Sequence, residues 1–143
     1  MSAENAAFIR RWFEEVWNKK RIDAIDEMAS PDLVGHGQAQ HGFDMSREQF
    51  KQFARDVIAA FPDIRVDIEL IVSESDLVAA RWSATMTHKA PYIGMAATGR
   101  TVHITGTSIA RIADGKVVEG WDNWDQLALL VQIGAVPAAA FAA

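Results

Sequence analysis

The order of helical and extended patterns along the chain predicts an α+β fold, with helices packed on one face of a curved antiparallel sheet. Three observations lead to this prediction. Apolar residues recur every three to four positions early in the chain, the period changes to two from Ile64, and four strands then follow one another. Such a sheet wrapped around a long amphipathic helix forms a cone whose open end is a pocket. A chain of 143 residues has the size of one domain, so a single domain over residues 1–143 is expected.

The first two helices are indicated by their apolar faces. On the first, apolar residues recur at three- and four-residue steps, namely Phe8, Ile9, Trp12, Phe13, Val16 and Trp17. Two tryptophans on this face require a large covering surface. A shorter helix follows with Ile22, Ile25 and Met28 on its apolar side, and Ser30-Pro31 is expected to end it.

A capping box marks the start of the third helix. A brief extended piece at Leu33 and Val34 and a polar stretch over residues 35–44 precede it. Ser46 begins the helix, because Gln49 three residues later completes the capping box, and Pro62 follows its end. Its buried side is expected to consist of Phe50, Phe53, Val57, Ile58 and Phe61.

The strands are indicated by alternation and by turn signals. The apolar residues that alternate with charged ones on the first strand, and that we expect to be buried, are Ile64, Val66, Ile68 and Leu70. A turn at residues 73–76 leads to a strand over residues 77–88, and a loop over residues 89–100 follows. A strand over residues 102–112, the hairpin signal Asp114-Gly115 and a strand over residues 116–125 complete the sheet. A closing helix that ends at Gly134 is indicated by Leu127, Leu129, Leu130 and Ile133.

The composition excludes several classes of protein. Half of the residues are hydrophobic, which excludes a disordered chain, and the absence of cysteine excludes a disulfide scaffold and a thiolate metal site. A chain with a net charge of −5 lacks the basic surface that nucleic-acid binding requires, so no nucleic-acid partner is expected. The N-terminus lacks the pattern of a secretory signal, and no apolar segment has the length to cross a bilayer. We therefore expect a cytoplasmic protein with no membrane partner.

Four segments resemble the SnoaL-like polyketide cyclases of the nuclear-transport-factor-2-like (NTF2-like) superfamily. They are EEVWNK at residues 14–19, AFPD at residues 60–63, Arg81-Trp82, and WDNWDQLALL at residues 121–130. The resemblance implies an ester cyclase that needs no metal or organic cofactor and closes a ring of a polyketide ester by an intramolecular aldol reaction. It also implies that Asp122, at the matching position of the last strand, acts as acid and base. The sequence departs from the family pattern at Gly120, where relatives often have a histidine, and at Ser108, where many have an acidic residue.

Asp122 is the leading catalytic candidate on physical grounds as well. Alternation places Val118, Gly120, Asp122 and Trp124 on one face of the last strand. If that face looks into the cone, loss of water raises the pKa of the Asp122 carboxyl, which suits a base that takes a proton next to a carbonyl. The alternative is an exposed carboxylate or a cap of the closing helix, a role for which Asp125 is better placed.

Two histidines are candidates for assisting Asp122. His36 follows the first short strand, and a neutral imidazole there would donate a hydrogen bond to a substrate carbonyl or carry protons. His88 follows Trp82 and Met86 on an inward strand face. The alternatives are a solvent-exposed loop histidine at His36 and a hydrogen-bonded structural histidine at His88. The other two histidines, His41 and His103, are expected to be inert and solvent-facing, respectively.

The remaining candidates describe a pocket for a small hydrophobic molecule. Phe53, Trp82, Met86 and Trp124 are expected to line it together with Ser108, and Tyr92 and Met95 are expected to form a lid. His36 and His41 are not spaced as metal ligands, so no metal site is expected.

The sequence supports three functions in a fixed order. The first is a cofactor-independent enzyme that uses Asp122 on a hydrophobic carbonyl substrate. The second is a non-catalytic small-molecule-binding protein, and the third is an epoxide hydrolase or isomerase, for which Arg81 is the arginine nearest to the expected pocket. A homodimer is also expected, because a flat and short-chained outer sheet face needs cover. That face comprises Arg81, Ser83, Thr85, Thr87, Thr105 and Thr107.

Overall fold

The computed structural model describes residues 2–37 and 44–141, so His41 lies outside the described residues. Helix α1 (Ser2–Trp12) continues directly into the π-helical segment η1 (Phe13–Asn18), and α2 (Asp23–Met28) leads into strand β1 (Ala29–His36). Helix α3 (Arg47–Ala60) precedes the strands β2 (Arg65–Glu74), β3 (Leu77–Thr87), β4 (Thr101–Ala113) and β5 (Lys116–Trp124). Helix α4 (Gln126–Gln132) and the 3-10 turn η2 (Ala138–Phe141) follow. The predicted α+β order is confirmed.

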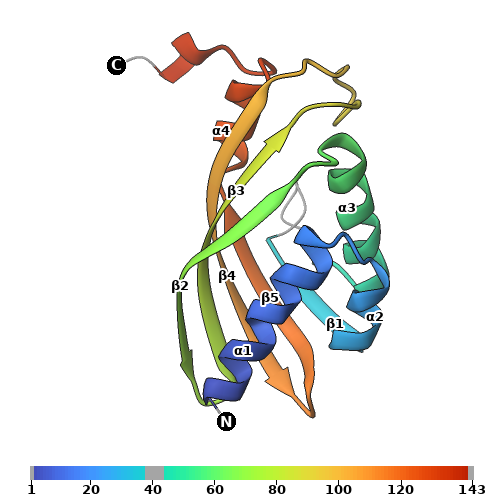
Figure 1. Ribbon diagram of the computed structural model, residues 1–143, viewed down its shortest axis with the longest axis vertical. Helices are drawn as coiled ribbons and strands as arrows, with labels where there is room; N and C mark the ends of the chain where they lie inside the picture. Colours follow the sequence, from blue (N-terminus) through green and yellow to red (C-terminus); the bar gives the residue numbers. More distant parts are fainter. Residues whose placement is uncertain (1, 38–43, 142–143) are drawn as a thin grey trace.

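The strands of the described residues form one curved sheet in the order β1-β5-β4-β3-β2. Neighbours are antiparallel except β1, which pairs in parallel with β5. Figure 1 shows α1 and α3 on one face of this curved sheet, while the start of α1 and the turn η2 lie at opposite ends of the molecule. The helices and the concave face of the sheet enclose the core, which gives the cone that the sequence predicted.

The capping residues predicted from the sequence are confirmed. The Ser46 hydroxyl accepts a hydrogen bond from the Gln49 amide at 3.2 Å, and the Gln49 side chain accepts one from the Ser46 amide at 2.9 Å. Asp125 caps α4 by accepting from the Ala128 amide at 3.0 Å. Among the described residues, no helix has both the length and the apolar character needed to span a membrane.

Two strand predictions were wrong in detail. The extended piece at Leu33 and Val34 is the middle of an eight-residue strand, which Pro31 can join because β1 is an edge strand. On β2, Leu70 was expected in the core but is 54% exposed. The register between β2 and β3 shifts between Ile68 and Leu70, so the extra residue Glu69 forms a bulge that turns Leu70 outward and Ile71 inward.

An apolar row crosses the outer face of the sheet. Val72 lies opposite Ala79, Ala79 opposite Ile109, and Ile109 opposite Trp121, so these four residues of β2 to β5 share one face. Val72 is 60% exposed and Ile109 is 38% exposed. We call Val72, Ala79, Ile109 and Trp121 the outer row.

Candidate functional site

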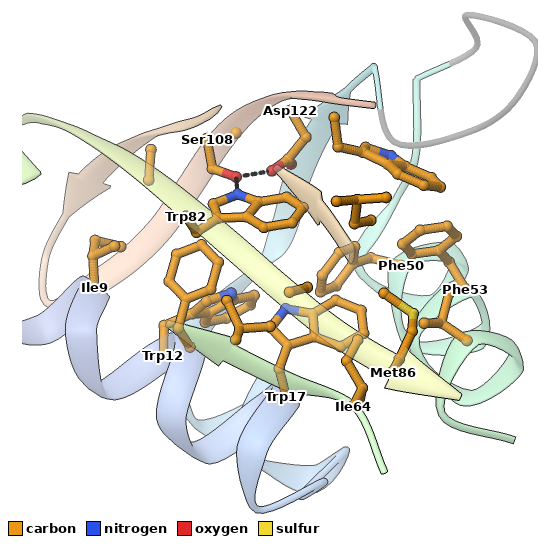
Figure 2. Close-up of a pocket in the computed structure, with 18 of the residues that line it drawn as sticks. Ile9, Trp12, Trp17, Phe50, Phe53, Ile64, Trp82, Met86, Ser108 and Asp122 are labelled. Atoms are coloured by element: carbon orange, nitrogen blue, oxygen red, sulfur yellow. Dashed lines mark hydrogen bonds between the residues drawn. The ribbon is translucent and has the colours of Figure 1, made fainter. Parts of the chain in front are cut away.

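A cavity of about 120 Å³ lies between the helical segments and the concave face of the sheet. Figure 2 shows its wall as aromatic side chains from several elements: Trp12 ends α1, Trp17 belongs to η1, and Phe50 and Phe53 project from α3. Strand β3 adds Trp82 and Met86, while Trp124 comes from β5 and Tyr92 from the loop after β3. Because these residues come from elements far apart in sequence, the wall exists only in the folded chain.

The π-helical geometry of η1 brings aromatic residues to this wall. Phe13 and Trp17 both line the cavity, and the end of the segment is held against β2. Asn18 accepts from the Val66 amide at 2.7 Å and donates to the Val66 carbonyl at 3.0 Å, as a neighbouring strand would. The Lys20 ammonium donates to the carbonyls of Asn18 and Ile64, each at 3.0 Å. These contacts satisfy backbone groups at the helix end and fix the position of Trp17.

A hydroxyl and a carboxylate form a polar end of the cavity. Asp122 and Ser108 face each other on β5 and β4, where they form a cross-strand pair. The Ser108 hydroxyl donates to Asp122 Oδ1, and Trp82 Nε1 donates to Ser108 Oγ at 3.0 Å. Figure 2 shows these three side chains in a line across the sheet. Most of the other described lining residues are aliphatic or aromatic, so polar chemistry is concentrated at this end.

The backbone around Asp122 is closely packed. Gly37, with φ of +76°, follows β1, and a Cβ added there would lie 2.3 Å from the Asp122 carbonyl oxygen. Only glycine therefore fits at this position, both because of its backbone conformation and because of the close approach. Asp122, Gly120 and Trp124 all line the cavity, as alternation predicts. Val117, which the alternation placed on the other face, is buried and lines the cavity too, because the register shifts at Val118.

The sequence matches the model of the SnoaL-like polyketide cyclases over residues 7–133. The chain belongs to this family. AclR, a proposed hydroxylase from Streptomyces galilaeus, is 31% identical with a TM-score of 0.86, and the match covers 96% of this chain and all of AclR. IdmH, a proposed polyketide cyclase from Streptomyces antibioticus, is also 31% identical with a TM-score of 0.79, covering 91% of this chain and 98% of IdmH. A proposed SnoaL-like cyclase from Jannaschia sp. CCS1 is 25% identical, with a TM-score of 0.84 and 95% of each chain covered. A search of curated proteins gave no match.

In this SnoaL-like protein, His36 does not meet Asp122. Its position in β1 opposite Trp121 puts it on the outer face, where the two rings stack with centroids 5.4 Å apart. Its Nε2 lies 2.8 Å from Glu119 and its Nδ1 lies 2.7 Å from Asp44. The carboxylate of Glu119, and then that of Asp44, raise the pKa of His36. Both ring nitrogens are thus engaged on the face away from the cavity.

His88 also lies apart from the cavity lining. It is fully buried beside Phe61, and its Nδ1 lies 3.0 Å from the Thr98 hydroxyl and 3.3 Å from the Thr98 amide. These contacts match the structural alternative considered for this residue. His103 lies on the exposed face, with its Nδ1 3.1 Å from the Thr85 hydroxyl.

The two expected lid residues differ in their contacts. Tyr92 is buried, lines the cavity and packs edge-on against Phe61 at 5.3 Å. Met95 packs against the core, and its backbone pairs with that of Tyr92 through two hydrogen bonds of 2.9 Å. Phe53, Trp82, Met86, Ser108 and Trp124 line the cavity.

Sequence reasoning assigned Trp12, Trp17 and Phe50 to the core and missed their place in the cavity wall. Their helical period signals only an apolar face, which a packed core and a cavity wall both require. Among the described residues, no group of three or more histidine, aspartate or glutamate side chains is placed to hold a metal ion.

Proposed function

We propose that this protein is a cofactor-independent enzyme in which Asp122 removes a proton next to a carbonyl of a hydrophobic substrate. The observation that supports this proposal most directly is the position of the Asp122 carboxylate at the polar end of an aromatic cavity. Family membership supports it independently, because the family is that of polyketide cyclases. A positioned base contributes about 10²–10⁴-fold to a rate.

For an ester cyclase the reaction is an intramolecular aldol addition. Asp122 takes the proton α to one carbonyl, and the resulting enolate carbon attacks a second carbonyl carbon of the same molecule. One carbon–carbon bond forms, the second carbonyl becomes an alkoxide, and the proton on Asp122 returns to that oxygen. The product is an isomer of the substrate, so the balance requires no oxidant or reductant. Holding both carbonyl groups in one folded substrate lowers the entropic part of the barrier.

The size of the cavity bears on the substrate. An apolar cavity of about 150 Å³ admits benzene, and this cavity measures about 120 Å³. A polyketide of several rings therefore requires the aromatic side chains of the wall to move. Trp17 and Phe53, whose rings meet edge-on at 6.4 Å, come from different helical segments and can separate without breaking either one.

Proton abstraction can be tested without knowing the natural product. Purified protein is incubated in D₂O with a panel of polyketide methyl esters and enolisable ketones, and deuterium at the α-carbon is followed by mass spectrometry. Wild-type protein should accelerate exchange for at least one compound, and Asp122→Asn should reduce that rate about 10²-fold or more while remaining folded. Asp67→Asn is the matched control, since Asp67 is an exposed carboxylate on β2. Equal exchange in wild-type and Asp122→Asn protein would contradict the proposal.

A binding protein without catalysis is the second candidate. The observation in its favour is that the structure brings neither His36 nor His88 to Asp122, so no histidine of the described lining assists the carboxylate. Quenching of tryptophan fluorescence by a compound that never exchanges deuterium would support this alternative. Epoxide hydrolysis through Arg81 has less support, because Arg81 lies on the outer face and pairs with Glu69 at 3.0 Å.

A further inference from the structure

We propose that Trp82 and Ser108 are positioning residues that hold Asp122 in its ionised form and fix which of its oxygens faces Ser108. This inference rests on the proposed role of Asp122 as a base and adds two residues to it. It is carried by the line of side chains that crosses three neighbouring strands, from Trp82 on β3 through Ser108 on β4 to Asp122 on β5.

The chemistry of the donors sets the direction of this chain of hydrogen bonds. An indole N–H can only donate, so at 3.0 Å the Ser108 oxygen must accept from Trp82. The single hydrogen of the Ser108 hydroxyl is then directed at Asp122 Oδ1. A carboxylate accepts this hydrogen, whereas a carboxyl protonated on Oδ1 would compete with it. The arrangement therefore favours the charged form of Asp122, which is the form that a base requires.

The backbone makes room for this arrangement at Gly106. Trp82 and Gly106 are cross-strand partners on β3 and β4, and the indole lies across the position where a side chain of residue 106 would begin. A Cβ at Gly106 would lie 2.3 Å from Trp82 Cζ2. With glycine there, the indole reaches along β4 to Ser108, two residues further on. The small residue Ala80, the partner of Ser108 on β3, lies on the same face.

Ser108 has a further consequence for the resemblance noted in the sequence. Where many relatives have an acidic residue, a second carboxylate beside Asp122 would disfavour two negative charges at once. Serine donates instead of repelling. In this chain Asp122 therefore depends on a neutral donor, and the pH at which it becomes a base should depend on Ser108 and Trp82.

The test is a carboxyl titration by NMR, which needs no substrate. Protein labelled with [¹³C]aspartate is titrated, and the Asp122 signal is identified as the one missing from Asp122→Asn. Ser108→Ala should raise the titration midpoint of Asp122 by about one pH unit, a tenfold change in proton affinity. Trp82→Phe keeps an aromatic ring, removes the N–H, and should raise the midpoint by a smaller amount. Thr107→Ala, next to Ser108 but on the exposed face, is the matched control and should leave the midpoint unchanged.

A second signal separates a hydrogen-bond chain from a general loss of packing. The Trp82 indole N–H resonance of wild-type protein should shift with pH at the same midpoint as Asp122, and Ser108→Ala should abolish that shift. The proposal is overturned if the indole signal ignores the Asp122 titration, or if Ser108→Ala and Thr107→Ala give the same midpoint. Failure of the deuterium-exchange test would reject the catalytic proposal while leaving these titrations interpretable.

Discussion

Replacing Gly106 by alanine should destabilise the fold and break the hydrogen bond between Trp82 and Ser108. The new Cβ would lie 2.3 Å from Trp82 Cζ2, whereas ordinary contact begins at 3.4 Å, so the indole must move by about 1 Å. Movement of that size takes Trp82 Nε1 out of hydrogen-bond range of Ser108 Oγ, from which it is now 3.0 Å away. Overpacking of a core costs about 1–3 kcal/mol, and a net hydrogen bond contributes about 1 kcal/mol.

The expected loss in the free energy of unfolding is therefore about 2–4 kcal/mol, which a domain of ordinary stability survives. Urea unfolding followed by tryptophan fluorescence measures it, and the midpoint should fall by about 1–2 M. The control is the same substitution in a Trp82→Leu background, where no indole stands in the way. There Gly106→Ala should change stability by less than about 0.5 kcal/mol. If Gly106→Ala costs as little in the wild-type background and leaves the Trp82 indole resonance in place, the packing argument is incorrect.

Three further predictions concern the rest of the molecule. Because Glu119 and Asp44 raise the pKa of His36 in the folded state, the stability that His36 contributes is present below its unfolded pKa of about 6.5 and is lost as the pH rises through the raised value. Thermal unfolding should thus show a larger deficit for His36→Gln at about pH 5.5 than at about pH 9, and an equal deficit would refute the assignment. Gly37→Ala should destabilise the protein in urea by about 1–3 kcal/mol, because both its φ of +76° and the Asp122 carbonyl oppose a Cβ; an unchanged midpoint would show that the backbone relaxes. We also propose that a second copy of the chain covers the outer row, so that light scattering gives a dimer and Ile109→Arg a monomer; a monomeric wild-type protein at micromolar concentration would contradict this.

Much of the fold could be predicted from local signals because those signals have local causes. The capping box at Ser46, the cap at Asp125 and the hairpin at Asp114-Gly115 depend on side chains and backbone angles within four residues. The position of Leu70 depends instead on a bulge, and nothing in the alternating pattern marks the extra residue.

The candidate site was predictable only in part, for a related reason. Asp122, Trp82 and Trp124 share an inward face that alternation reveals, and all three line the cavity. His36 looked equally suitable, yet its partner in the sheet is Trp121 and not Asp122, so its ring lies on the other face. A histidine next to a strand end carries no local signal of the face that it occupies. That is decided by the parallel pairing of β1 with β5, which joins segments more than eighty residues apart.

The bulge at Val118 has the largest effect on the site. From the tight turn at Asp114-Gly115 the hairpin pairs Ala113 with Lys116 and Ile112 with Val117, but the next pair is Arg111 with Glu119. Had the first register continued, Asp122 would lie opposite the exposed Thr107. The extra residue changes the register by one, which exchanges the two faces of the strand beyond it.

That change turns Asp122 inward and places it opposite Ser108. The β3–β4 ladder has no such shift over its whole length, so Ala80, Ser108 and Asp122 stand in register across three strands, with Trp82 one inward position further along. The proposed base and its two positioning residues thus meet because one hairpin has a bulge and the neighbouring ladder has none. The same irregularity turns Glu119 and Trp121 outward, where they hold His36. One inserted residue therefore decides both which carboxylate faces the cavity and which face of the sheet carries the histidine.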